Sequence, residues 1–168
     1  MISNLNVEFH NSCSHYFVEG MKYTYFRECE LLSQTAEKIL LIDLNFNSFR
    51  KIILDVSRGM FEEESFSVFF IFIVGDALIP LANYFILKSE YRTILARKKH
   101  IDSGSVIKMS RGVISPGAIL TEKEFLTLTL CLEGKDPVKN GINPKTFCSR
   151  KYSALRKLGK PKFSLLYS

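Results

Sequence analysis

The seven consecutive apolar residues Val68–Val74 (VFFIFIV) constrain the fold more than any other part of the sequence. This length is typical of a strand buried on both faces, as in parallel sheets that are covered by helices. Gly75 and Asp76 end the run, and a helical pattern follows over Leu78–Lys88, with Pro80 tolerated in its first turn. We therefore expect a buried strand followed by a helix.

The longer window Val68–Leu87 is the best candidate for a membrane span, but its polar residues argue against one. Asp76 and Asn83 lie inside the window together with Pro80. A charged side chain at the centre of a bilayer costs about 2.5–3.5 kcal/mol on insertion scales, so we expect no membrane segment. The N-terminal residues also lack the basic region and apolar core of a signal peptide.

Short apolar runs alternate with helical patterns over the first two-thirds of the chain, which indicates βαβ units and an α/β fold. The expected strands are Asn6–His10, Lys38–Asp43, Val68–Val74 and Tyr91–Ala96. The expected helices are Tyr16–Arg27, Phe46–Val56, Leu78–Lys88 and Ile101–Arg111. The stretch between Arg27 and Lys38 is too short for a full strand and helix, so the second βα unit is expected to be reduced or missing.

The glycine- and proline-containing stretch Gly112–Ile119 predicts a boundary between an α/β domain over 1–115 and a small all-α domain over 116–168. Beyond it, Thr121 and Glu124 form a capping box, which satisfies free N–H groups at a helix start, and Gly134 closes the element. A strand is the alternative, because four leucines alternate strictly with other residues: Leu126, Leu128, Leu130 and Leu132. The cap, the closing glycine and the length favour the helix.

The positive charge of the chain is concentrated near its C-terminal end. Residues 135–162 contain nine basic residues and one acidic residue, a net charge of +8 in a chain whose total is +6. Such an uneven distribution favours a polyanionic partner, usually nucleic acid. The alternative is a solvated surface that is basic without a partner.

The four cysteines fit neither a disulfide framework nor a zinc-binding pattern. Their spacing contains no C-x-x-C pair, so we expect reduced thiols in a cytoplasmic protein: Cys13, Cys29, Cys131 and Cys148. The three histidines form no spaced motif, and no Ser/His/Asp set stands out. We expect no enzyme activity, no metal and no cofactor.

Two segments of the C-terminal third carry a resemblance to a known family. They read LTEKEFLTLTLCLEGK over residues 120–135 and INPKTFCSRKYSALRKLG over residues 142–159. Together they resemble the LuxR-type helix-turn-helix of bacterial transcription regulators, over about 45 residues. The matching positions are Leu120, Thr121, Lys123, Glu124, Leu128, Gly134, Ile142, Lys145, Thr146, Lys157, Leu158 and Gly159.

The N-terminal part resembles a response-regulator receiver, which has a flavodoxin-like α/β fold. The similar segments are SCSHYFVEGM over residues 12–21, ILLIDLN over residues 39–45, and VIKMSRGVISP over residues 106–116 as the last receiver helix and its exit. The resemblance places Asp43 at the phosphoacceptor position, but Ser12 and Cys13 replace the acidic pair that would hold Mg²⁺. The resemblance therefore implies a degenerate receiver with Asp43 as a vestigial phosphoacceptor, as in regulators of fimbrial and other surface-adhesin operons.

The resemblance also implies roles for the residues of a helix around 144–158 that would enter the major groove of duplex DNA. Asn143 and Pro144 suit its start, and Phe147, Ala154 and Leu158 would pack inward. The residues expected to face the bases are Cys148, Ser149 and Tyr152. The residues expected at phosphates are Lys145, Thr146, Arg150, Lys151 and Arg156.

One element of the motif is shortened. The segment between Gly134 and Thr146 is about one helical turn, roughly four residues, shorter than the family pattern, so its scaffold helix should be a stub. The sequence thus predicts a phosphorylation-independent DNA-binding transcription regulator, a homodimer or a heterodimer with another LuxR-type factor. The alternative is a protein-interaction regulator that pairs with an intact LuxR-type factor as co-activator or antagonist and binds little DNA itself.

Overall fold

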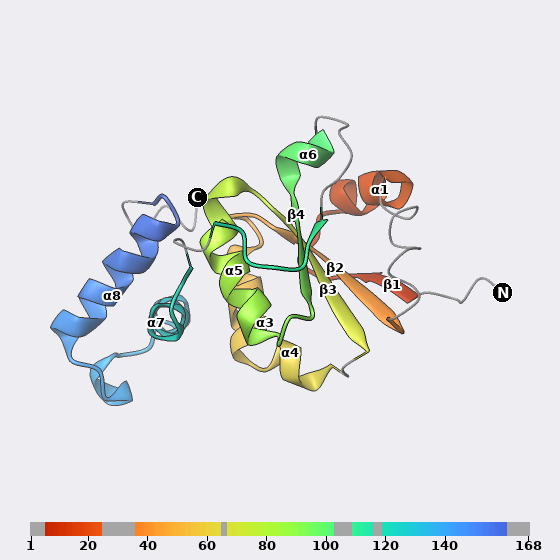
Figure 1. The fold of residues 1–168 in the computed structure, drawn as a ribbon. Helices are drawn as coiled ribbons and strands as arrows, with labels where there is room; N and C mark the ends of the chain where they lie inside the picture. Colours follow the sequence, from red (N-terminus) through yellow and green to blue (C-terminus); the bar gives the residue numbers. More distant parts are fainter. Residues whose placement is uncertain (1–5, 25–35, 65–66, 103–108, 116–118, 161–168) are drawn as a thin grey trace.

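The computed structural model describes residues 6–24, 36–64, 67–102, 109–115 and 119–160. A five-stranded sheet with helices on both faces forms most of the protein, and two further helices, α7 (Glu122–Glu133) and α8 (Pro144–Lys157), lie outside the helices that cover one of these faces (Figure 1). The α/β architecture expected from the alternating pattern is confirmed.

The sheet has the strand order β1-β2-β3-β4-β5, in which the first four strands are parallel and β5 is antiparallel to β4. The strands are β1 (Asn6–Phe9), β2 (Lys38–Leu44), β3 (Val68–Val74), β4 (Thr93–Arg97) and β5 (Met109–Ser110). The seven-residue apolar run is the central strand β3. Six of its seven residues are buried, because helices cover the sheet on both sides.

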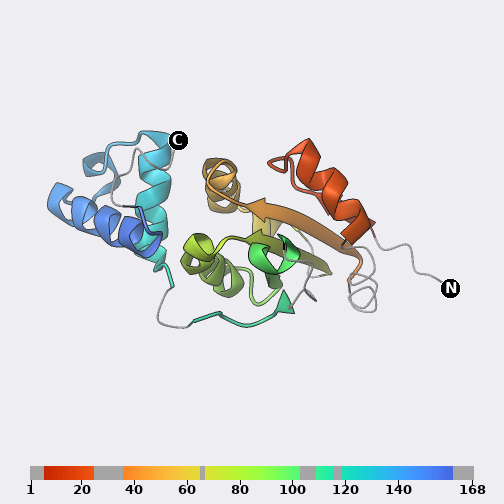
Figure 2. The same ribbon diagram turned by 90° about the horizontal axis from the view of Figure 1, so that it is seen from above.

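Helices lie on both faces of the sheet (Figure 2), and an apolar cluster of side chains fills each face. The larger cluster joins one face to α3 (Phe49–Ser57), α4 (Met60–Glu63) and α5 (Ile79–Lys88), which follows the short 3-10 helix η1 (Asp76–Leu78). The smaller cluster joins the other face to α1 (His15–Thr24) and α6 (Lys98–Asp102). Within the described residues, no helix is long and apolar enough to cross a membrane.

Helix α1 lies on the opposite face of the sheet from α3 and α5. The strand order nevertheless shows that β1 is followed by β2, β2 by β3 and β3 by β4 in one direction across the sheet. Right-handed crossings in one direction place their helices on one face. A helix on the other face is typical of a doubly wound sheet, where the chain first visits an outer strand and then returns. Most of the expected reduced βα unit falls in residues 25–35, outside the described residues, and β1 lies directly beside β2.

The expected helix over Ile101–Arg111 is wrong. The short helix α6 ends at Asp102, residues 103–108 lie outside the description, and Met109–Ser110 forms the edge strand β5. Met109 pairs with Ala96 and Ser110 with Leu95, so backbone pairing with β4 overrides the local helical pattern. The similarity of this stretch to the last receiver helix fails with it.

The C-terminal elements are α7 (Glu122–Glu133), the 3-10 helix η2 (Val138–Asn140) and α8 (Pro144–Lys157). Helix α7 has the expected capping box and ends at Gly134 in the left-handed conformation (φ 66°), so the helix and not the strand alternative is confirmed. Buried side chains of α7 and α8 belong to the same apolar cluster as α3 and α5. The division into two domains at residue 115 stays a prediction.

Candidate nucleic-acid interface

Helix α8 begins where its sequence indicates. The Asn143 side chain accepts a hydrogen bond from the Lys145 backbone N–H (2.9 Å), and Pro144 occupies the first helical position. The cap satisfies one of the free N–H groups at the helix start, and proline removes another. The helix therefore starts at a fixed residue, and this sets which of its side chains face outward.

The inner face of α8 packs against α7, which it crosses at a steep angle (Figure 2). Ala154, Leu155 and Leu158 are buried, and Phe147 is only half-buried. Inward packing is thus confirmed for Ala154 and Leu158 and holds in part for Phe147. Leu155 was not expected in the core, although its spacing of three residues from Leu158 places both on one helical face.

The outer face of α8 presents the residues that were expected at the bases. Cys148, Ser149 and Tyr152 are all exposed, and the Tyr152 side chain is 57% accessible. The Lys151 ammonium group lies 5.4 Å from the centroid of the Tyr152 ring, a cation–π distance. Three side-chain types that can meet base edges or sugars are therefore available on one surface.

The five residues expected at phosphates lie on the same helix, and all are at least partly exposed. Lys145, Thr146 and Arg156 are exposed, whereas Arg150 and Lys151 are half-buried. Within the described part of the chain, none of the four cations among them lies within ion-pairing distance of an acidic side chain. Their charge is thus available to an external anion.

Lys157 belongs to the same basic segment but points inward. Its ammonium group donates to Glu124 Oε2 (2.8 Å) and to the Ile119 carbonyl (2.8 Å), and the Ser153 hydroxyl donates to Glu124 Oε1 (2.5 Å). Burial opposes ionisation of Glu124, but hydrogen bonds from Lys157, Ser153 and Thr121 outweigh it and lower the pKa of the carboxyl group. Glu124 thus caps α7 and also joins it to α8.

The segment between α7 and α8 contains only a short element, and its identity as a shortened scaffold helix stays a prediction. One 3-10 turn, η2, stands between α7 and α8, and it has no buried residue. The Asp136 side chain accepts the Val138 N–H (2.9 Å), and Gly141 reverses the chain with a left-handed φ of 70°. Val138 is 60% exposed, so this turn does not pack against α8 as a helix with an apolar face would.

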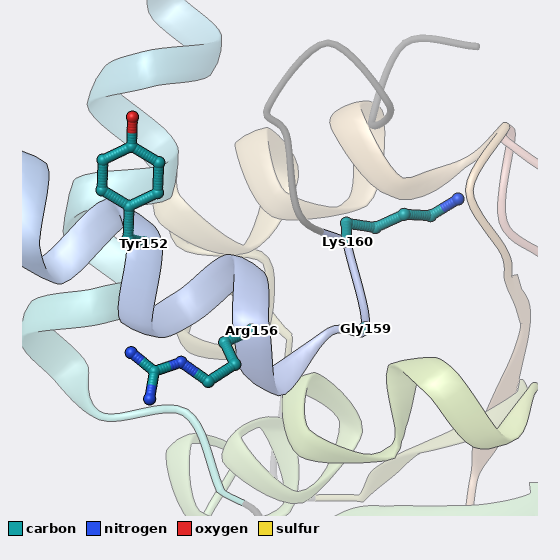
Figure 3. Close-up of a pocket in the computed structure, with 4 residues that line it drawn as sticks. All are labelled: Tyr152, Arg156, Gly159 and Lys160. Carbon is teal, nitrogen blue, oxygen red and sulfur yellow. The ribbon is translucent and has the colours of Figure 1, made fainter.

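A shallow open depression of about 430 Å³ lies at the C-terminal end of α8 (Figure 3). Tyr152, Arg156, Gly159 and Lys160 line it. The Lys160 side chain points away from Tyr152 and Arg156 (Figure 3), and its ammonium group lies 4.1 Å from the centroid of the Phe46 ring, in the segment that follows β2. Lys160 is therefore engaged within the chain, whereas Tyr152 and Arg156 face outward.

The polar edge of the sheet around Asp43 is the other candidate region. Asp43 is buried at the end of β2, and its Oδ2 accepts a hydrogen bond from the Asn45 amide (2.7 Å). The Cys13 sulfur lies 3.5 Å from the Asp43 backbone nitrogen, where the resemblance to receivers expects a carboxylate. The structure therefore brings Cys13 and Asp43 together, but with a thiol instead of an acid.

The neighbouring polar side chains bond to one another. Ser12 Oγ lies 2.8 Å from His10 Nδ1, and His10 Nε2 lies 3.1 Å from Asp55 Oδ2. Burial lowers the pKa of His10 more than the Asp55 carboxylate raises it. Within the described ranges, no group of three or more His, Cys, Asp or Glu side chains is placed to hold a metal ion.

Comparison of the chain with protein-family models, with curated proteins and with solved structures found no match in any of the three.

Proposed function

We propose that this protein is a DNA-binding transcription regulator that acts in the cytoplasm, with a receiver-like α/β domain and a LuxR-type helix-turn-helix. In this proposal α8 enters the major groove of duplex DNA, with Cys148, Ser149 and Tyr152 near the bases. Fimbrial or other surface genes are the proposed targets, and the active form is a homodimer or a heterodimer.

One observation carries the proposal. The exposed side of α8 combines small polar and aromatic side chains with four cations that have no acidic partner in the described residues: Lys145, Arg150, Lys151 and Arg156. Unpaired cations along one helix suit the phosphate backbone, whereas cations of an ordinary soluble surface are commonly interspersed with acids. None of the base-facing residues is a strong bidentate reader such as arginine on guanine, so modest sequence specificity is proposed.

The sheet edge supports action without phosphorylation. The carboxylate of Asp43 is buried and bonded to Asn45, and Ser12 and Cys13 stand where oxygen-rich ligands for Mg²⁺ are needed. Thiol and hydroxyl groups are poor substitutes for carboxylates toward that hard cation. DNA binding in this proposal therefore needs no phosphoryl group on Asp43.

Electrophoretic shift of labelled genomic duplex fragments by the full chain tests the proposal. The variant Lys145→Ala/Lys151→Ala should weaken binding at moderate salt, because each phosphate that is no longer neutralised keeps its counterions. The matched control Lys22→Ala/Lys99→Ala removes the same charge from surface ion pairs with Glu19 and Asp76 and should bind as the wild type does. Equal binding by the two double variants would refute the assignment of α8.

The three-residue η2 specifically favours a second candidate, a protein-interaction regulator. A motif whose second element is this short could pair with an intact LuxR-type factor and bind little DNA alone. Co-purification with such a factor, together with no shift of DNA by the isolated protein, would select this candidate over the first.

A further inference from the structure

A helix that reads DNA needs a second element to hold it at a fixed angle, and in this chain the element before it is too small to do so. In helix-turn-helix proteins the first helix of the motif crosses the DNA backbone while the second lies in the groove. Here that position is occupied by η2, three residues with no buried side chain. Whatever fixes the orientation of α8 must therefore come from another part of the chain.

Aromatic stacking and hydrogen bonds hold α7 on α5. The Phe125 ring stacks on Tyr84, with centroids 4.6 Å apart, and meets Phe85 edge-on at 6.1 Å. The Tyr84 hydroxyl donates to Glu122 Oε2 (2.6 Å). All three rings are buried, so this contact belongs to the core and is not a loose docking surface.

Further contacts fix both ends of α7 and the segment that leads into it. The Leu120 N–H donates to the Pro80 carbonyl (3.0 Å) before the helix, and an Arg50 guanidinium nitrogen lies 3.4 Å from the Leu132 carbonyl at its end. The Asn83 side chain donates to the Ile114 carbonyl and accepts the Ile114 N–H (2.8 Å). Contacts from α3 and α5 thus hold both ends of α7 and the segment that leads into it.

The C-terminal end of α8 has its own contact with the sheet domain. Gly159 takes a left-handed φ of 65°, and Lys160 then reaches the ring of Phe46 in the loop after β2, 4.1 Å from nitrogen to centroid. Phe46 is itself supported by Phe49 of α3, with ring centroids 6.2 Å apart. Lys157, one turn earlier, is held by Glu124 of α7.

We propose that the α/β domain takes the place of the missing scaffold helix: α3, α5 and the loop carrying Phe46 fix the angle of α8, with Phe46 and Lys160 as positioning residues. The inference rests on the proposed function. We call the contact between Phe46 and Lys160 the brace, and neither side chain belongs to the outer face of α8. A change in the brace therefore alters the placement of that face but leaves the number of its phosphate contacts unchanged. Removing the brace can weaken DNA binding by no more than the free energy with which the brace favours the bound placement of α8.

The test compares full-length variants for affinity and for the dependence of affinity on salt. Phe46→Leu and Lys160→Met should each weaken duplex binding about two- to fivefold, which corresponds to the usual strength of a partly exposed cation–π contact. The slope of log K against log salt concentration should stay as it is in the wild type. Phe46→Tyr keeps the aromatic face and should bind as the wild type does. The double variant Phe46→Leu/Lys160→Met should be no weaker than either single variant, because both remove the same contact.

Several outcomes would overturn the proposal. Wild-type affinity in both single variants would remove the positioning role, and a slope reduced by about 0.9 in Lys160→Met would show that Lys160 contacts a phosphate directly. Loss of binding in Phe46→Tyr as large as in Phe46→Leu would also contradict it.

Amide hydrogen exchange separates this inference from the proposed function. If the wild type binds no DNA, the proposed function falls, and exchange in the last turn of α8 then decides the brace. Faster exchange of the Leu158 and Lys160 amides in Phe46→Leu than in Phe46→Tyr supports the brace, because those N–H groups bond to Ala154 and Leu155 carbonyls only while the turn is held. Equal exchange would overturn it.

Discussion

The outer face of α8 and the polar edge of the sheet around Asp43 are both rich in polar side chains, but only the second is internally paired. At the sheet edge, Asp43 is bonded to Asn45, and Ser12, His10 and Asp55 form a chain of contacts. On α8 the outward cations have no acidic neighbour in the described residues. Groups that bond to one another stabilise the fold, whereas unpaired exposed charges are available to a partner.

Lys157 sharpens this comparison, because it lies on α8 and yet belongs with the paired groups. Glu124→Ala removes the partner of Lys157, the acceptor of Ser153 and half of the α7 capping box. We expect the free energy of unfolding to fall by about 2–4 kcal/mol, less than the sum of about 3–5 kcal/mol for a fully buried ion pair and about 0.5–2 kcal/mol for a cap, because the Lys157 side chain is 29% exposed. Urea denaturation measures this loss.

The control for that measurement is Glu133→Ala, which breaks a surface pair with Lys135 (2.8 Å). Surface pairs contribute about 0–1 kcal/mol, so this variant should stay close to the wild type. Equal losses in the two variants would mean that Glu124 does not join α7 to α8.

Charge reversal on the outer face of α8 should have a large effect on DNA binding and a small effect on stability, whereas Glu124→Ala is expected to affect stability. Arg150→Glu/Arg156→Glu removes two possible phosphate contacts and adds repulsion. We expect affinity at physiological salt to fall by about 30-fold or more, from the counterion-release contribution of two phosphates. Fluorescence anisotropy with a duplex measures it, and an unfolding midpoint shifted as far as in Glu124→Ala would contradict the comparison.

The paired sheet edge predicts a dependence of stability on pH. Burial lowers the pKa of His10 in the folded protein below its ordinary value of about 6.5, so the unfolded chain binds the proton more readily. The contribution of His10 to stability is therefore fully present above about pH 6.5 and is lost as the pH falls through the pKa of the folded state. Urea denaturation between pH 7.5 and pH 5 should show a smaller decline in His10→Gln than in the wild type.

The exposed residue His15 provides the control, because its replacement by Asn should leave the pH dependence as it is in the wild type. The same flattening in His15→Asn would show that the decline does not arise from burial of His10.

The smallest expected effect concerns Asp43. Acetyl phosphate should leave duplex affinity unchanged within about twofold, because Cys13 and Ser12 do not supply the carboxylates that Mg²⁺ prefers. Incubation with radiolabelled acetyl phosphate provides the second measurement. Labelling of the wild type that disappears in Asp43→Ala would contradict the phosphorylation-independent account.

Local patterns in the sequence were sufficient for the elements whose signals are themselves local. Helix α7 was predicted from the capping box at Thr121 and the closing Gly134, and α8 from its Asn143–Pro144 start. The central strand was predicted from the uniform apolarity of Val68–Val74. Hydrophobic periodicity and helix caps involve residues that are only a few positions apart, so they can be recognised without knowledge of the tertiary contacts.

Contacts between distant segments could not be predicted in this way. Tyr84 lies within the expected helix Leu78–Lys88, Phe46 begins the expected helix Phe46–Val56, and Lys160 is one of the nine basic residues of the segment 135–162. Phe125, which stacks on Tyr84, lies 41 positions away from it along the chain. Lys160, the cation–π partner of Phe46, lies 114 positions away from it. The edge strand at Met109–Ser110 was missed for the same reason, because only its pairing with β4 defines it.

The salt dependence of duplex binding tests the central claim most directly, namely that the outer cations of α8 contact phosphates. The slope of log K against log salt should fall in magnitude by about 1.8 in Lys145→Ala/Lys151→Ala, about 0.9 for each phosphate contact removed, relative to the wild type. The inward-pointing Lys160, replaced by Met, should leave the slope unchanged. Identical slopes for the wild type and the Lys145→Ala/Lys151→Ala variant would contradict the account.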